Sequence, residues 1–241
     1  FVGCISENLL NNVDIKKDII MRKNKNNQLK KIEKDKIKNK KTKILAVGDL
    51  HGDLVFVKRL AERAEKENVD VIILAGDMTM GEKSIGGIIG PFAKIKRDVL
   101  IVPGNHEAIS TTAFLSEAYA PYAKHLHGYS FYKNGVGFFG AGTANVGIHQ
   151  IPDSEIFQLL KKSHEKVKDL GKKIMVTHIH PKGSLSEFSG WEGSEAVRKA
   201  INKFQPDFAI CAHIEEGSGL EEKMGKTRVI NVARKAKIFD I

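Results

Sequence analysis

Short apolar runs that end abruptly in polar residues recur along the chain from residue 43 onward. Residues 43–48 (KILAVG), 69–76 (VDVIILAG) and 98–104 (DVLIVPG) are almost continuously apolar and rich in β-branched side chains. Such runs are typical of strands buried on both faces of a parallel sheet. A helix is predicted after the first run, because apolar residues recur there at the spacing of one helical face: Leu54, Val57, Leu60, Ala61 and Ala64. Repeated strand–helix units predict an α/β domain with a mainly parallel sheet.

The second half of the chain adds a hairpin and further strand–helix units. The pair Asn134-Gly135 within residues 130–142 predicts a tight hairpin turn between two strands. Apolar residues at helical spacing from Ile156 to Leu170 predict a helix that stops at Gly171. Further elements are predicted from the same patterns: strands at 172–178 and 207–213, a helix with Val197, Ala200, Ile201 and Phe204 on one face, and two strands within 227–241.

The charge divides the chain into two parts. Residues 1–43 carry 13 Lys/Arg and 5 Asp/Glu, a net of +8 out of the total of +10, which leaves +2 for residues 44–241. We therefore expect a basic, Lys- and Asn-rich leader over 1–43, mobile or loosely helical, and a globular domain over 44–241. A solvated extension is favoured over a nucleic-acid-binding arm, although the latter stays open.

The expected cellular setting is inferred from the lack of long apolar runs and of closely spaced cysteines. No apolar run approaches the roughly 18 residues of a membrane span, so no membrane partner is expected. Cys4 and Cys211 are the only cysteines and lie far apart, so no disulfide framework is predicted. A reducing, cytoplasmic setting is the default expectation. The sequence makes no prediction about the oligomeric state.

Polar residues of the kinds that bind metals follow the predicted strands. In open α/β sheets, ligands bind just beyond the carboxyl ends of the strands, so these residues are expected to share one crevice. Carboxylate, imidazole and amide groups together suit Mn²⁺, Fe or Zn²⁺ rather than an all-thiolate or all-oxygen site. The residues concerned are Asp49, His51, Asp77, Asn105, His106, His178 and His213.

The segments GDLHGD, AGDM, PGNHE, VTHIHP and CAHIEE, in this order, resemble the calcineurin-like metallophosphoesterase superfamily. The resemblance covers residues 43–241 and is closest to the small single-domain branch related to cyclic-nucleotide phosphodiesterases. It implies a four-layer sandwich, in which two packed mixed β-sheets are flanked by helices. It also implies a dinuclear metal site, with Asp49 and His51 on the first ion and Asp77 bridging both. Asn105, His178 and His213 would bind the second ion.

The same resemblance assigns the two residues that follow Asn105. His106 would lie near the phosphate as a general acid or charge stabiliser rather than as a ligand. Glu107 stands where the family usually has Asp, and would orient that histidine.

Two positions depart from the family pattern. Glu215 occupies the place of a second histidine of the first ion's shell, and Asn231-Val232-Ala233 replaces a usual Asn-Pro-Gly turn. If Glu215 is a ligand, its charge favours Mn²⁺ or Fe²⁺, with Zn²⁺ or Ni²⁺ as alternatives. If Glu215 points to solvent, the first metal position is weak. Both readings stay open at this point.

The resemblance and the residues together predict a hydrolase. We expect a metal-dependent phosphoesterase, preferably a phosphodiesterase, in which water activated by two divalent ions attacks a phosphate ester. The alternatives are a non-enzymatic protein-binding scaffold with an impaired metal site and a nuclease guided by the basic leader. Trp191 and Phe188 follow His178 in the sequence, and could stack on a substrate base or, more commonly, cap the core.

Overall fold

A computed structural model of the chain describes residues 41–83 and 85–241. The predicted leader over 1–43 lies almost wholly outside these residues, so its prediction stands untested. The described part contains two β-sheets and five α-helices, and among its helices none has the length and apolar content needed to cross a membrane.

The first sheet has the strand order β11-β1-β2-β3-β4. Four of its strands are parallel, and only β11 runs antiparallel to its neighbour β1. Three of the parallel strands match the predicted apolar runs closely. The bounds are β1 (Lys43–Val47), β2 (Val71–Ala75), β3 (Asp98–Val102), β4 (Ala123–His125) and β11 (Lys237–Asp240).

The second sheet has the order β5-β6-β7-β8-β10-β9. Its inner strands are parallel, while β5 and β9 are antiparallel edge strands. The predicted hairpin joins β5 to β6, and Asn134 and Gly135 both have positive φ there, of 50° and 83°. The bounds are β5 (Ser130–Lys133), β6 (Val136–Ala141), β7 (Lys172–Thr177), β8 (Phe208–Cys211), β9 (Glu221–Met224) and β10 (Thr227–Asn231).

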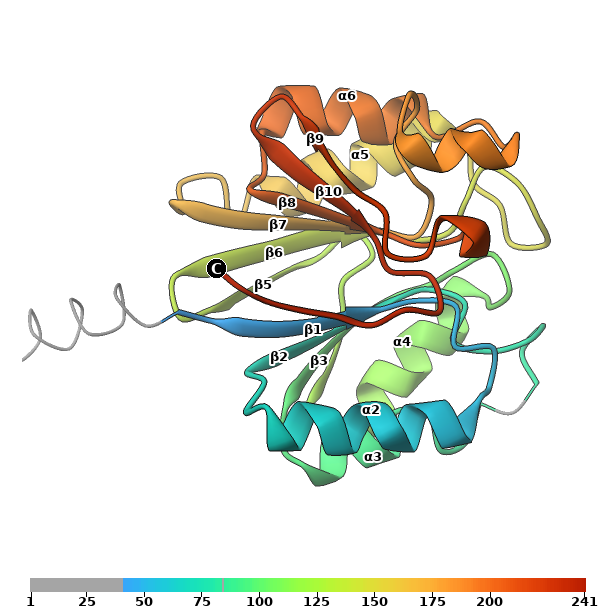
Figure 1. Ribbon diagram of the computed structural model, residues 1–241, viewed down its shortest axis with the longest axis vertical. Coiled ribbons are helices and arrows are strands. Elements are labelled where there is room, and N and C mark those ends of the chain that lie inside the picture. Colours follow the sequence, from blue (N-terminus) through green and yellow to red (C-terminus); the bar gives the residue numbers. More distant parts are fainter. Residues whose placement is uncertain (1–40, 84) are drawn as a thin grey trace, which may run out of the picture. The chain divides into compact units, whose positions relative to one another are not determined.

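Helices cover the outer faces of both sheets (Figure 1). Helices α2 (Leu54–Lys66), α3 (Gly90–Lys94) and α4 (Ile109–Ala118) pack on the first sheet, and α5 (Asp153–His164) and α6 (Glu195–Phe204) pack on the second. Two short 3₁₀ turns, η1 (Leu185–Ser189) and η2 (Glu215–Gly217), lie in loops. The predicted fold, two packed mixed sheets flanked by helices, is confirmed.

Alternation along the strands produces three apolar layers. In β1, Ile44 and Ala46 face a core shared by the two sheets, whereas Leu45 and Val47 face the layer under α2. Residues of the second sheet divide in the same way between the shared core and a layer under α5 and α6. A strand between two apolar layers must be apolar on both faces, which explains the continuous runs in the sequence.

Two local predictions differ from the structure. The helix expected to reach Leu170 ends at His164, and Val167 and Leu170 are carried by hydrogen-bonded turns that keep them packed over Gly137. Leu54 was placed on the buried face of its helix, but it is 39% exposed because it lies in the first turn, at the rim of the domain.

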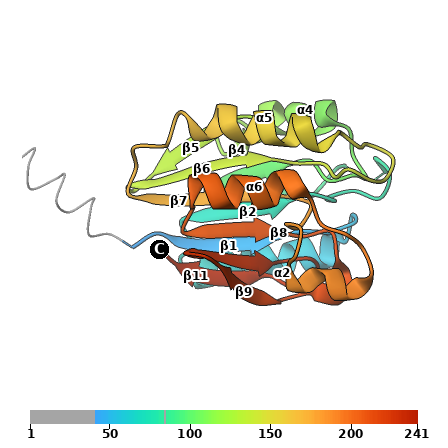
Figure 2. The same cartoon turned by 90° about the horizontal axis from the view of Figure 1, so that it is seen from above.

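The strands of the two sheets bring their carboxyl ends together. Figure 2 shows β1, β2 and β8 running toward the same end of the domain, where the connecting loops gather. Every predicted ligand follows a strand at this end, so the fold itself places these residues in one region.

Candidate metal centre

The loops that follow β1, β2 and β8 turn sharply at the predicted ligands. Asp49, His51, Asp77 and His213 all have positive φ, between 46° and 72°. Residues other than glycine rarely adopt this left-handed region, and such strained backbone clusters at functional sites. The strain indicates that packing holds the backbone of these four residues in place. An unstrained turn would direct their side chains elsewhere.

One half of the centre is buried and tightly hydrogen-bonded. The Nε2 atom of His178 lies 3.0 Å from Oδ1 of Asn105 and 3.4 Å from Oδ2 of Asp77, while its Nδ1 bonds the carbonyl of Ala75 at 2.8 Å. Asp77, His178 and His213 each offer a ligand atom within 4.8 Å of the others. A carbonyl on Nδ1 fixes the ring orientation and leaves Nε2 directed at the centre, an arrangement common for metal-binding histidines.

The other half is more open to solvent. Asp49 is buried and accepts a hydrogen bond from the His213 amide at 3.0 Å. His51 Nε2 lies 3.9 Å from Asp49 Oδ1 and 3.1 Å from Glu215 Oε1, although the Glu215 side chain is 49% exposed. These three side chains also offer ligand atoms within 4.8 Å of one another. The contact with His51 favours the reading in which Glu215 points into the site.

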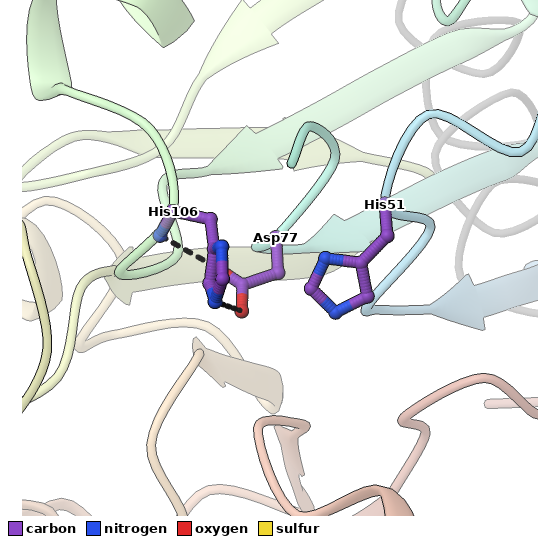
Figure 3. A group of neighbouring side chains, drawn as sticks. All are labelled: His51, Asp77 and His106. Carbon is purple, nitrogen blue, oxygen red and sulfur yellow. Dashed lines mark hydrogen bonds and ion pairs between the residues drawn. The ribbon is translucent and has the colours of Figure 1, made fainter. Parts of the chain in front are cut away.

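His106 lies close to residues of both halves. Figure 3 shows its ring beside Asp77, with His51 across from them. The His106 amide bonds Asp77 Oδ1 at 2.9 Å, and its Nε2 lies 3.9 Å from Asp77 Oδ2. His51, Asp77 and His106 form a third group with ligand atoms within 4.8 Å, so distance alone does not separate a proton donor from a ligand here. The predicted catalytic role of His106 therefore stays a prediction.

Glu107 makes other contacts than those expected. Its fully buried carboxylate accepts hydrogen bonds from the Gly104 amide at 2.8 Å and from the Met78 and Thr79 amides at 3.4 Å. Among its hydrogen bonds within the described residues, none goes to the His106 ring. Glu107 thus joins the loop after β2 to the loop after β3, and its longer side chain, compared with Asp, reaches backbone instead of imidazole.

Burial and the neighbouring charges shift the pKa values of the carboxylates and imidazoles in the centre. Burial raises the pKa of Asp49 to about 6, against the opposing effect of His178. Burial also disfavours the charge of Asp77, but His178 outweighs it and holds the Asp77 pKa well below its usual range. In turn, and despite burial, Asp77 and Asp49 raise the pKa of His178. A bound cation would satisfy the two carboxylates in place of that imidazole proton.

The surroundings of His213 favour its neutral imidazole. Burial lowers the pKa of His213 to about 3, and the neighbouring His178 adds to the shift. A histidine must be neutral to bind a metal, so this environment favours the form that a ligand requires.

Two positions near Asp77 require glycine because candidate ligands lie close to the backbone there. A Cβ atom at Gly104 would lie 1.9 Å from Asp77 Oδ1, and one at Gly76 would lie 2.5 Å from His178 Nδ1. Gly76 also has φ of 87°, a conformation that other residues rarely adopt. Both positions therefore admit no side chain without moving a candidate ligand.

Sequence reasoning missed Arg234. Its guanidinium donates to the carbonyls of Asp49 and Leu50 at 3.2 and 3.1 Å and lies 3.3 Å from Asp53 Oδ2. It therefore braces the turn that carries Asp49 from a residue 185 positions away. It follows the Asn231-Val232-Ala233 segment, and no motif signalled its role.

Phe188 and Trp191 do not cap the core as the commoner expectation had it. They are 65% and 57% exposed. Trp191 borders a pocket of about 440 Å³ whose wall includes Asn105, His213 and Glu215. The aromatic residue therefore lies next to the candidate centre.

The donor set fits divalent cations. Three groups of possible ligands are linked because Asp77 belongs to two of them and His51 belongs to two, and the groups combine carboxylate oxygens with imidazole nitrogens. Such a mixed set matches Mn²⁺, Fe or Zn²⁺ in ligand type. The structure brings together Asp49, His51, Asp77, Asn105, His106, His178, His213 and Glu215, while the assignment of each ligand to a particular ion remains a prediction.

Solved structures show the same fold. A protein of Thermus thermophilus aligns with a TM-score of 0.66 at 20% identity, covering 83% of this chain and 99% of that one. A dimetal phosphatase from Danio rerio aligns with a TM-score of 0.55 at 12% identity, over 79% and 86%. The GAP50 anchor of the Plasmodium inner membrane complex gives 0.55 at 12% identity, over 80% and 71%. At these identities the likeness concerns the fold alone.

The sequence itself matches a family. No curated protein sequence is significantly similar to this chain. The model of the family described as calcineurin-like phosphoesterase matches residues 42–215, which include every predicted ligand. The chain therefore belongs to the calcineurin-like phosphoesterase family.

Proposed function

We propose that this protein is a metal-dependent phosphoesterase, and more narrowly a phosphodiesterase acting on a small or exposed diester. The observation that carries the proposal is the convergence of two carboxylates and two imidazoles from both sheets. Asp49 and Asp77 follow strands of the first sheet, whereas His178 and His213 follow strands of the second. Their ligand atoms nevertheless meet in overlapping groups.

The roles of the residues follow from their places in the centre. Asp77 belongs to two of the three groups and is proposed to bridge two ions. Asn105, His178 and His213 would hold the buried ion, and Asp49, His51 and Glu215 the more exposed one. Two bound divalent cations supply a water of lowered pKa and neutralise the charge of the phosphate oxygens.

His106 is proposed to serve the leaving group. It is 31% exposed at its side chain, so a substrate can reach it, while its backbone is fixed on Asp77. A histidine held in this way can deliver a proton from Nε2 to the departing oxygen or stabilise its charge. The acidic donor set favours Mn²⁺ or Fe²⁺ over Zn²⁺ or Ni²⁺.

The test is turnover combined with metal analysis. The purified full chain would be stripped of metal, reloaded in turn with Mn²⁺, Fe²⁺, Zn²⁺ and Ni²⁺, and assayed on p-nitrophenyl phosphate and bis(p-nitrophenyl) phosphate. We expect faster hydrolysis of the diester, with Mn²⁺ or Fe²⁺ as the best metals. Two bound ions with no hydrolysis of either ester would refute the enzyme and favour the scaffold. Faster hydrolysis of the monoester would refute the diesterase alone.

A further inference from the structure

The pocket beside the candidate centre is large enough for an organic ligand. Its volume of about 440 Å³ falls in the range of small-molecule sites. The residues that line it include Asn105, His213 and Glu215 of the centre together with Trp191 and Val146. A phosphate ester bound at the centre would therefore place one of its organic groups against Trp191.

Trp191 lies on a loop whose backbone is held firmly. Its carbonyl bonds His180 Nε2 at 3.3 Å, and His180 is fully buried. The Glu187 carboxylate accepts hydrogen bonds from the amides of Gly183 and Gly193, at 2.8 and 2.9 Å, and so closes the base of the loop. The backbone is thus preorganised, which lowers the entropic cost of binding at this wall.

The indole ring itself is free to receive a partner. It is 57% exposed, and within the described residues it has no hydrogen bond, stacked ring or cation over its face. A single exposed apolar residue is ordinary on a protein surface. The difference here is the location, because Trp191 lines the same cavity as the candidate ligands Asn105, His213 and Glu215.

The charge of the pocket limits what can enter it. Glu215 and Glu216 both line it, and none of its lining residues is Lys or Arg. The cations of the proposed centre could neutralise one phosphate group. A second phosphate farther along the same ligand would face Glu216 with no positive side chain from the pocket wall to compensate it.

We propose that Trp191 determines specificity by stacking on a flat aromatic group of a phosphate ester that carries no further anionic group. A nucleoside joined to a single phosphate has this chemistry, whereas a sugar phosphate lacks the flat group and a nucleoside bisphosphate carries an extra anion. The inference rests on the proposed function only for the position of the phosphate at the metal centre.

The chain offers an internal reporter, because Trp191 is its single tryptophan. The Mn²⁺-loaded full chain would be titrated with adenosine monophosphate and with ribose 5-phosphate while the tryptophan emission is recorded. Stacking on a base contributes about 1–3 kcal/mol, so the nucleotide should bind roughly fivefold to 150-fold more tightly. Of the two ligands, only adenosine monophosphate should change the tryptophan emission strongly. Equal affinities for the two ligands would overturn the proposal.

Variants at the ring separate stacking from general loop effects. Calorimetry on Trp191→Ala should show adenosine monophosphate binding weakened to the level of ribose 5-phosphate, with ribose 5-phosphate itself unchanged. Trp191→Tyr should retain most of the preference because it keeps a flat ring. The matched control is Phe188→Ala, which removes an exposed ring of the same loop that does not line the pocket. A loss in Phe188→Ala equal to that in Trp191→Ala would also overturn the proposal.

The charge limit has a separate readout. Adenosine 3′,5′-bisphosphate should bind about twofold to fivefold more weakly than the monophosphate, and Glu216→Gln should narrow that gap. Tighter binding of the bisphosphate would contradict this part of the proposal.

The binding measurements do not depend on turnover. If the protein prefers adenosine monophosphate to ribose 5-phosphate but hydrolyses neither model ester, the proposed function alone is refuted. If it hydrolyses the model diester but shows no such preference, the proposed role of Trp191 is refuted.

Discussion

The two halves of the candidate centre use similar ligands in different surroundings. Asp77, Asn105 and His178 are buried, and each is hydrogen-bonded to another of them or to backbone. His51 and Glu215 lie toward solvent, and the Glu215 side chain is 49% exposed. A rigid, desolvated shell binds a cation with little reorganisation, whereas an exposed carboxylate must be ordered first and is screened by water. If two ions bind as proposed, we expect a tighter metal position in the buried half and a weaker one in the exposed half.

Asp77→Asn should have the largest effect, because it removes the carboxylate that is proposed to bridge the two ions. Activity should fall by about a thousandfold or more, and both ions should be lost, since an uncompensated change in a buried charge cluster costs about 3–5 kcal/mol. Metal content by mass spectrometry and kcat/KM on the diester would be measured together. Retention of both ions in this variant would show that Asp77 is not the bridge.

His106→Ala should reduce turnover by about a hundredfold to a thousandfold while leaving both ions in place, because a proton donor acts on the leaving group and does not hold the metal. The measurement is kcat beside metal content. The control is an ester with a p-nitrophenolate leaving group, which needs little protonation and should be affected less than an alkyl ester. If the metal were lost from this variant, His106 would belong to the ligands that it contacts.

Gly104→Ala should disturb the buried half most strongly, because it displaces Asp77. The new methyl group would lie 1.9 Å from Asp77 Oδ1, and a displacement of about 1 Å at a reacting centre can cost about a hundredfold in rate. Affinity for the tighter ion and kcat/KM should both fall. Gly171→Ala is a matched control, because a Cβ there meets no atom within 4 Å. Equal behaviour of the two variants would argue against close packing as the source of rigidity.

Glu215→Gln should have the smallest effect and should act on the exposed half. Affinity for the weaker ion should fall by roughly tenfold, because one partly solvated charge is removed, and the tighter ion should stay bound. Glu215→His restores an imidazole and should shift the preference from Mn²⁺ toward Zn²⁺. Titration of the metal-free protein with each ion would measure both changes. No change in either variant would mean that Glu215 is not a ligand.

Sequence reasoning reached most of the strands but not all of the elements between them. The continuous apolar runs of β1, β2 and β3 are local consequences of burial on both faces, so they can be recognised without a partner. Helix α4 was not predicted, because its buried residues Thr112 and Leu115 are too few to form an apolar stripe. Strand β9 is a short edge strand with the sequence EEKM, whose pairing with β10 is decided by tertiary contact.

In the candidate site, too, the sequence predicted some features and missed others. Residue types and their position after strands indicated Asp49, His51, Asp77, Asn105, His178 and His213, because carboxylate, amide and imidazole groups are common metal ligands and the loops after parallel strands meet at one edge. The contacts of Glu107 could not be anticipated, because the length of a side chain does not reveal which backbone amides lie within its reach. Its hydrogen bonds to Met78 and Thr79 depend on how two loops meet.

Local pattern and composition were enough to predict the apolar layers, the hairpin and the chemical kinds of ligand. The packed fold was needed to show that Glu215 reaches His51, that Arg234 stabilises the Asp49 turn and that Trp191 borders the centre. These contacts join segments that are distant in the chain. Their geometry is fixed by the packing of two sheets against each other, which no local pattern encodes.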